Sequence, residues 1–233
     1  MRAQNPNIEI LEMTVKQLGE LADEMVFLGG CATGLLISDK AAPPIRVTRD
    51  VDTIVQAGSL AEYHKLSERL RKQGFKEDTS DGAPLCRWVG NSVILDVMPT
   101  DQKILGFSNR WYPMAMQQAE SVTLPSGNEI RLVSAPCFLI TKLEAFEGRG
   151  KGDYQLSHDM EDIVAVLDGR PELATEISCV EVGLKLELAS RFRQLLNDHR
   201  FMDALAGHLP ADSASQARLP LIITRIRDIT EIQ

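Results

Sequence analysis

The chain has 233 residues, of which 44% are hydrophobic and 25% are charged, values that are ordinary for a globular protein. No window approaches the roughly 18 apolar residues that a membrane-spanning helix needs, and the first residues lack the apolar core of a signal peptide, so we expect a cytoplasmic protein with no membrane partner. The net charge of −8 argues against broad, sequence-independent binding of nucleic acid, which depends on many Lys and Arg contacts to phosphate.

The cysteine pattern argues against a zinc cluster. Cys31, Cys86, Cys137 and Cys179 form no Cys-x-x-Cys pair, and each lies beside apolar or small residues. We therefore expect reduced, partly buried thiols. Cys31 follows a glycine pair, and we interpret it as a small packing residue rather than a nucleophile.

Helical and strand-like patterns alternate in the first part of the chain. Apolar residues at helical spacing predict helices, and short apolar runs bounded by glycine, asparagine or proline predict strands and hairpins. In chain order the predicted elements are a helix over 8–24, a strand over 25–28, a helix over 32–38, a loop over 39–44, a strand over 51–55, a helix from Leu60 to Gly74 capped by Ser59, a hairpin over 85–97 with its turn at Gly90-Asn91, and a hairpin over 122–133.

The last third of the chain has helical patterns almost throughout. The predicted helices cover 134–146, 157–168, 171–178, 181–197 and 214–228. We therefore predict an α/β or α+β portion of the catalytic type over residues 1–134. A helical C-terminal domain of residues 135–233 follows.

Three aspartates interrupt strand-like segments. Asp50 and Asp52 share one face of a predicted strand because side chains alternate along it, and like charges this close repel unless a cation lies between them. Asp96 stands in the apolar run 93–98, and an adjacent antiparallel strand would bring this third carboxylate within reach. Mg²⁺ prefers such hard oxygen ligands. The pattern predicts a site for Mg²⁺ or Mn²⁺; alternatively, Asp50 caps a turn while Asp52 and Asp96 face solvent.

A glycine pair separates the first predicted strand from the next helix. Gly29 and Gly30 lack a Cβ, so their backbone can approach a phosphate closely. The N-terminus of the following helix adds N–H donors and a favourable dipole for an anion. The alternative is a plain strand-to-helix turn.

Together these residues resemble the nucleotidyltransferase superfamily of the DNA polymerase β type. The matching residues are Leu28-Gly29-Gly30, Asp50-Val51-Asp52 and Asp96. The finer pattern, Gly-Gly-x-Ala followed by Arg46-x-Thr48-x-Asp50-x-Asp52, is similar to the AbiEii/AbiGii toxin family of prokaryotic nucleotidyltransferases.

The resemblance continues downstream and covers about residues 25–168. The segments Thr141-Lys142-Leu143-x-Ala145 and His158-Asp159-x-x-Asp162-Ile163 match a lysine and an aspartate motif of that family. The chain departs from the pattern in two places, because His158 replaces the more usual Lys or Arg and the segment before Asp50 contains Pro43-Pro44.

The resemblance implies an α+β fold with a nucleotidyltransferase-like mixed sheet flanked by helices, and a catalytic domain of residues 1–134. It also assigns roles to particular residues. Those roles are metal ligation by Asp50, Asp52 and Asp96, nucleotide binding by Gly29, Gly30, Thr48 and Lys142, and catalysis by Asp50, Asp52, Asp96, Lys142 and Asp159. Asp162 lies on the same helical face as Asp159, and one of the two would contact the nucleotide or orient Lys142.

The activity implied is Mg²⁺- or Mn²⁺-dependent transfer of a nucleoside monophosphate from a nucleoside triphosphate. The acceptor would be a hydroxyl of RNA, tRNA included, or of a protein, and the chain would be the toxin of a toxin–antitoxin or phage-defence module with a cognate antitoxin. The alternatives are a non-catalytic nucleotide-binding module and a transferase that modifies a small molecule such as an antibiotic.

Overall fold

The computed structural model describes residues 5–232. Residues 1–4 lie outside this range. They belong to the N-terminal segment in which the sequence lacks the apolar core of a signal peptide. The chain divides into two compact units. The sheet unit comprises Pro6–Ala32 and Val47–Ser134, and the helical unit comprises Thr33–Arg46 and the chain from Ala135. The segment Thr33–Arg46, which the sequence-based division places in the first domain, thus belongs with the helices.

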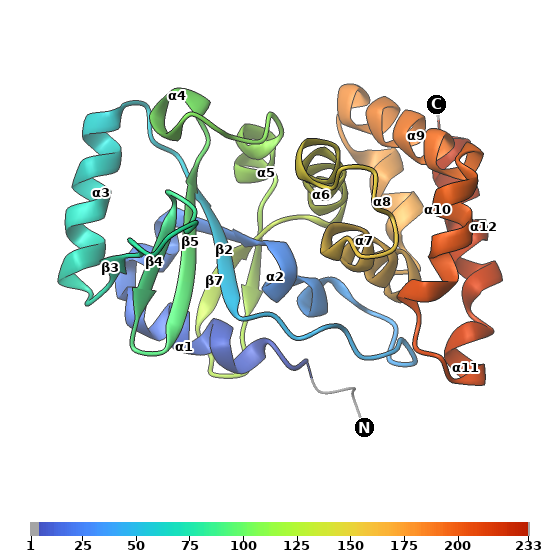
Figure 1. Cartoon of the computed structure of the whole chain (residues 1–233), viewed down its shortest axis with the longest axis horizontal. Coiled ribbons are helices and arrows are strands. Elements are labelled where there is room, and N and C mark those ends of the chain that lie inside the picture. The colour runs from blue at the N-terminus through green and yellow to red at the C-terminus, as the bar shows by residue number, and fades with distance from the viewer. Residues whose placement is uncertain (1–4, 233) are drawn as a thin grey trace. The chain divides into compact units, whose positions relative to one another are not determined.

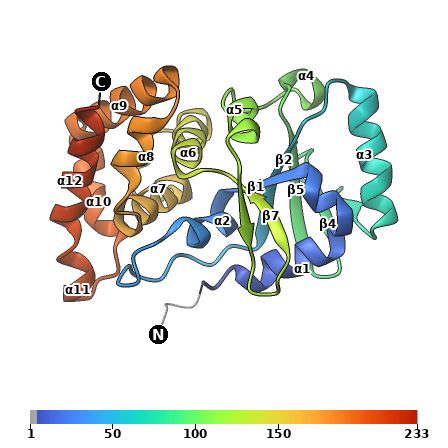
Figure 2. The same ribbon diagram turned by 180° about the vertical axis from the view of Figure 1, so that it is seen from behind.

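The sheet unit is built on one seven-stranded sheet in the order β3-β4-β5-β2-β1-β7-β6 (Figure 1). Its strands are β1 (Met25–Leu28), β2 (Asp50–Val55), β3 (Lys76–Glu77), β4 (Arg87–Gly90), β5 (Val93–Pro99), β6 (Glu120–Thr123) and β7 (Glu129–Leu132). The sheet is mixed, because β2 pairs in parallel with β5 and β1 pairs in parallel with β7, whereas the other pairs are antiparallel. Figure 2 shows β1 and β7 side by side from behind. The predicted α+β class with a mixed sheet is confirmed.

The pairing of β2 with β5 corrects one expectation. We expect Asp96 to lie on a strand antiparallel to that of Asp50 and Asp52, but the two strands are parallel. Between them the chain runs through α3 (Leu60–Lys72) and the short strands β3 and β4. This long crossover connection returns the chain to the same end of the sheet, as parallel pairing requires.

Helices of the sheet unit are anchored to the sheet by caps and buried polar contacts. They are α1 (Ile8–Leu18), continued by a 3-10 helix (Gly19–Glu24), α3, α4 (Gln102–Leu105) and α5 (Tyr112–Gln117). Ser59 caps α3 as predicted, since its Oγ accepts a hydrogen bond from the Glu62 amide at 3.2 Å. The Tyr63 hydroxyl donates to the Val97 carbonyl of β5 at 2.9 Å. The spacing of Leu60 with Tyr63, Leu66 and Leu70 predicts a common apolar face for this helix, but Leu60 is instead 51% exposed.

The helical unit consists of packed helices that follow the last strand. They are α6 (Ala135–Arg149), α7 (His158–Gly169), α8 (Leu173–Cys179), α9 (Val182–Asn197), α10 (His199–Leu205), a 3-10 helix (Ala206–His208), α11 (Ser213–Gln216) and α12 (Leu219–Thr230). α6 packs against α7, α8 and α9, and α12 packs against α7, α8 and α9. The remaining helix, α2 (Gly29–Leu36), begins directly after β1. Within residues 5–232, no helix is both long and apolar enough to cross a membrane.

Candidate functional site

The carboxylates of β2 lie on the more open face of the sheet. Asp50 and Asp52 are partly exposed, whereas Val51 and Thr53 between and after them are fully buried. The parallel register places Asp96 of β5 directly opposite Asp52. Because side chains alternate along a strand, all three carboxylates project from the same face. We call this set, Asp50, Asp52 and Asp96, the carboxylate face.

A guanidinium lies between two of these carboxylates. Arg87 of β4 stands opposite Asp96 in the antiparallel register of β4 and β5. Its Nε and Nη2 donate to the two oxygens of Asp96, both at 2.8 Å, and Nη2 also donates to Asp50 Oδ2 at 3.0 Å. The hydrogen bonds to Asp96 raise the pKa of Arg87 further above its usual value. Arg87 thus stays charged and neutralises part of the carboxylate face.

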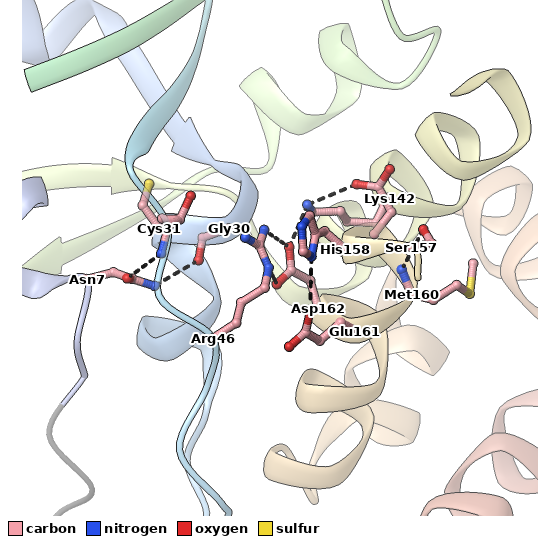
Figure 3. A network of polar contacts seen from close by, with 12 residues as sticks. Asn7, Gly30, Cys31, Arg46, Lys142, Ser157, His158, Met160, Glu161 and Asp162 are labelled. Atoms are coloured by element: carbon pink, nitrogen blue, oxygen red, sulfur yellow. Dashed lines mark hydrogen bonds and ion pairs between the residues drawn. The ribbon is translucent and has the colours of Figure 1, made fainter. Parts of the chain in front are cut away.

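The other oxygen of Asp50 is held by Thr48. The Thr48 hydroxyl donates to Asp50 Oδ1 at 2.7 Å, and the Thr48 amide donates to Asn7 Oδ1 at 3.0 Å. Asn7 is fully buried, and its Nδ2 donates to the Gly30 carbonyl at 3.4 Å (Figure 3). Asn7 therefore ties the glycine turn to the segment that precedes β2. Thr48, predicted to bind nucleotide, here fixes the orientation of a carboxylate.

Gly29 is required by its contact with Asp52. Its φ is +72°, and a Cβ at this position would lie 1.9 Å from Asp52 Oδ2. Only glycine avoids this clash and also adopts positive φ at no steric cost. The glycine turn and the carboxylate face are therefore in direct contact, and the first turn of α2 starts at the Asp52 carboxylate.

The thiols near this face are not set up as nucleophiles. Cys31 is fully buried and its Sγ donates to the Leu28 carbonyl at 3.5 Å, in agreement with a packing role. Burial, with the nearby charges of Asp96 and Asp52, raises the pKa of Cys86 to about 12, so this thiol stays protonated at neutral pH. Cys137 is buried as well, whereas Cys179 is exposed, contrary to the expected partial burial.

The second group of candidate residues forms a buried charge network in the helical unit. Lys142 of α6 donates from Nζ to Asp159 Oδ1 at 3.1 Å and to Asp162 Oδ2 at 2.7 Å, both on α7. Figure 3 shows the Lys142 side chain extending toward Asp162. The side chains of Lys142, Asp159 and Asp162 are only 8%, 6% and 1% exposed. The predicted lysine and both predicted aspartates are therefore brought together.

Two arginines complete this network. Arg46 makes two hydrogen bonds of 2.8 Å to Asp162, and Arg149 makes two of 2.9 Å to Asp159. Burial opposes ionisation of both aspartates, but these arginines and Lys142 outweigh it and hold the pKa of each carboxyl below its usual range. Both aspartates are therefore ionised at neutral pH. The Nζ of Lys142, which we expect to contact a triphosphate, already donates to both of them.

The carboxylate face fits one divalent ion better than a set of three ligands. Among residues 5–232, no group of three or more His, Cys, Asp or Glu side chains is arranged to hold a metal ion. Both Asp96 oxygens accept hydrogen bonds from Arg87. Asp50 also accepts hydrogen bonds on both oxygens, but only one of them comes from Arg87. Asp50 and Asp52 are therefore the better-suited pair, because Mg²⁺ is commonly held by one or two carboxylates together with substrate phosphates.

Sequence reasoning missed Arg87 and Asn7. Arg87 lies in the predicted hairpin over 85–97, and counting the register outward from the turn places it opposite Asp96. That count requires the turn to be placed one residue further on than predicted, at Asn91-Ser92. Asn7 carries no comparable signal, because its contacts to Gly30 and Thr48 join segments that are distant along the chain.

Comparisons with known proteins bear on the fold. No protein-family model matches the sequence, and no curated protein is significantly similar to it. Among solved structures, an antigenic nucleotidyltransferase-like protein from Paracoccidioides brasiliensis is similar with a TM-score of 0.50 and 19% identity, over 87% of this chain and 94% of that one. JHP933 from Helicobacter pylori is similar with a TM-score of 0.47 and 12% identity, over 96% of this chain and 90% of that one. The similarity to the Paracoccidioides brasiliensis protein shows that the chain has a nucleotidyltransferase-like fold.

Proposed function

We propose that the chain is a Mg²⁺- or Mn²⁺-dependent nucleotidyltransferase that transfers a nucleoside monophosphate from a nucleoside triphosphate to a hydroxyl group. The observation that carries this proposal is the placement of Asp50 and Asp52 side by side on the partly exposed face of β2, with the Gly29 backbone against Asp52. The nucleotidyltransferase-like fold agrees with it.

In the sheet unit, some residues would bind the divalent ion and the phosphates, and others keep those side chains in position. Asp50 and Asp52 would hold the divalent ion, which when bound screens the phosphates and polarises the bond that breaks. Thr48 keeps the Asp50 carboxylate in one orientation through its hydroxyl. Gly29 and Gly30 give the triphosphate close access to the backbone and to the first amides of α2.

The transfer itself exchanges one phosphoester bond for another. The acceptor hydroxyl oxygen attacks the α-phosphorus, the bond from that phosphorus to the bridging oxygen breaks, and pyrophosphate leaves with the electron pair. The hydroxyl proton passes to water. The family resemblance would give Asp96 a part in deprotonating the acceptor hydroxyl, but both of its oxygens already accept hydrogen bonds from Arg87. We therefore assign Asp96 a charge-balancing role.

Lys142 and Asp159 keep their proposed part in activity through the charge network of the helical unit. Lys142 is a compact cation suited to a triphosphate, and Asp159 and Asp162 hold its ammonium group in place. A Lys142→Met variant that folds but loses nucleotide affinity would support this assignment, whereas unchanged affinity would remove Lys142 from the site.

The experiment that tests the activity is incubation of the purified chain with each labelled ribonucleoside triphosphate, Mg²⁺, total RNA and cell-extract protein. We expect label on RNA or protein with wild type and none with Asp50→Asn or Asp52→Asn. Asp203→Asn, at an exposed position of α10, is the matched control and should label as wild type does. Binding of triphosphate without any turnover would instead indicate a non-catalytic module. Label only on small molecules would indicate an antibiotic-type acceptor.

The toxin role is the finest part of the proposal and rests on the motif resemblance. Induced expression of the wild-type chain should arrest bacterial growth, and expression of the Asp50→Asn variant to the same level should not. Equal growth with both chains would exclude a toxin that acts through this site, and a partner that restores growth would be the antitoxin.

A further inference from the structure

We propose that Arg87 is a built-in replacement for a second divalent cation, so that the carboxylate face binds one metal ion rather than two. The inference rests on the proposed function for its role in catalysis, but it concerns how many ions this face accepts. It follows from the pairing of Arg87 with Asp96 and Asp50.

The fold brings three negatively charged carboxylates close together. Asp50, Asp52 and Asp96 share one face, and the register places two of them directly opposite each other. Three carboxylates at such short spacing repel one another unless cations lie among them. In the structure one such cation belongs to the chain, because the Arg87 guanidinium donates to Asp96 and Asp50 at once.

The sheet determines the position of Arg87. Arg87 faces Asp96 because β4 and β5 form a hairpin whose turn residues Asn91 and Ser92 have φ of 31° and 72°. A shift of one residue in this register would move Arg87 to the opposite face. The pairing is therefore a property of the hairpin and not of one rotamer on a free surface.

A divalent ion would have to compete with Arg87 for Asp96. The guanidinium takes both Asp96 oxygens in a two-point contact, the strongest geometry for an Arg–carboxylate pair. The side chains of Arg87 and Asp96 are only 23% and 9% exposed, so little water stands ready to replace these bonds. A divalent ion could bind Asp96 only by displacing Arg87 and leaving its charge without a partner. Asp50 accepts only one hydrogen bond from Arg87, so a single ion held by Asp50 and Asp52 would leave the two-point contact with Asp96 in place.

The test is titration of the full chain with Mn²⁺ in the absence of nucleotide, measured by electron paramagnetic resonance or calorimetry. Mn²⁺ stands in for Mg²⁺ because both prefer oxygen ligands. We expect wild type to bind one Mn²⁺ and Arg87→Gln to bind two. Arg71→Gln is the matched control, since Arg71 forms an exposed pair with Glu77 in the same unit, and it should match wild type. Two ions in wild type, none in wild type, or one in Arg87→Gln would overturn the proposal.

A second variant covers the case in which Arg87→Gln does not fold. Asp96→Asn preserves the side-chain shape and removes the third carboxylate. If Arg87 already keeps metal away from Asp96, this variant binds one Mn²⁺ as wild type does; loss of an ion would show that Asp96 is a ligand. These readouts need no turnover, so they are separate from the labelling experiment that decides the activity.

Discussion

Individual hydrogen bonds, more than the sheet alone, decide what the carboxylate face can do. Asp50 is bonded by Thr48 on one oxygen and by Arg87 on the other, and both Asp96 oxygens are bonded by Arg87. If the proposed function holds, Asp50 so fixed would need little reorganisation to hold the divalent ion, and such preorganisation favours charge stabilisation in a transition state. The single residues that position the carboxylates therefore matter as much as the carboxylates.

The contact of Gly29 with Asp52 gives a prediction at this scale. Gly29→Ala should destabilise the sheet unit and weaken Mn²⁺ binding, because its Cβ would lie 1.9 Å from Asp52 Oδ2. Gly106→Ala is the control, since its φ is +81° and a Cβ added there would meet no atom within 4 Å. In both variants alanine must adopt a positive φ, which lowers the stability by about 1–2 kcal/mol for a residue with a side chain.

Urea unfolding and Mn²⁺ titration of the two variants separate conformation from contact. We expect Gly106→Ala to lose only the cost of positive φ and to bind Mn²⁺ normally. Gly29→Ala should lose clearly more stability and also affinity. Equal losses in both variants would show that the approach of Gly29 to Asp52 has no energetic consequence.

At the scale of elements, the hairpin of β4 and β5 determines the site as much as any motif. Ser92 has φ of 72° in its turn, a conformation that glycine adopts far more readily. Ser92→Gly should stabilise the chain by about 0.5–1 kcal/mol, which is the relief of left-handed strain less the greater entropy that glycine loses on folding.

Chemical unfolding of Ser92→Gly beside Ser121→Gly checks this prediction. Ser121 is an exposed residue inside β6, where glycine should destabilise by roughly 0.5–1 kcal/mol. Opposite signs for the two variants are the expected result. Destabilisation by Ser92→Gly would mean that the turn conformation, and with it the register of Arg87 and Asp96, is held by other contacts.

Local patterns predict the elements whose causes are local. The apolar run of β1 and the cap at Ser59 follow from sequence spacing and from a side chain that bonds its own helix. The direction of β5 relative to β2 does not, because it depends on the path of the intervening crossover. Apolar spacing does not predict the seven-residue helix α10, whereas it does predict α8, which has the same length.

In the candidate site, too, some residues are predictable from the local sequence and others depend on distant partners. The carboxylates and glycines are recognisable because their residue types are unusual within apolar runs. Arg87 and Asn7 are common residues whose importance comes from partners in other segments. Arg46 enters the sequence argument only as part of a motif, yet it binds Asp162, which lies 116 positions further along the chain. Long-range pairing of this kind leaves no trace in local composition.

At the scale of the whole molecule, buried charge makes stability depend on pH. Asp159 and Asp162 have pKa values below their usual range, so each contributes stability above the unfolded-state pKa of about 3.9. That contribution is lost as the pH falls through the lower folded-state pKa. Ionised Asp168 has the opposite effect on stability, because burial raises its pKa despite its ion pair with Arg218.

Removal of one charge from the network should therefore change both stability and its pH dependence. Asp162 binds Lys142 and Arg46 and its side chain is 1% exposed, so Asp162→Asn leaves two cations with fewer partners. Loss of one partner from a buried ion pair costs about 3–5 kcal/mol. We expect a loss of this size at pH 7 and a smaller difference from wild type near pH 3, which lies below the unfolded-state pKa, so that part of the contribution of ionised Asp162 has been lost.

Urea unfolding of the full chain at pH 7, 5 and 3 measures this effect, with Asp203→Asn on the exposed side of α10 as the control. The control should follow wild type at every pH. A constant difference between Asp162→Asn and wild type from pH 7 to pH 3 would mean that the charge on Asp162 contributes nothing, and that its shape and hydrogen bonds carry the whole effect. A difference that shrinks on acidification shows that ionised Asp162 holds Lys142 and Arg46 in place, as the proposed nucleotide contact by Lys142 requires.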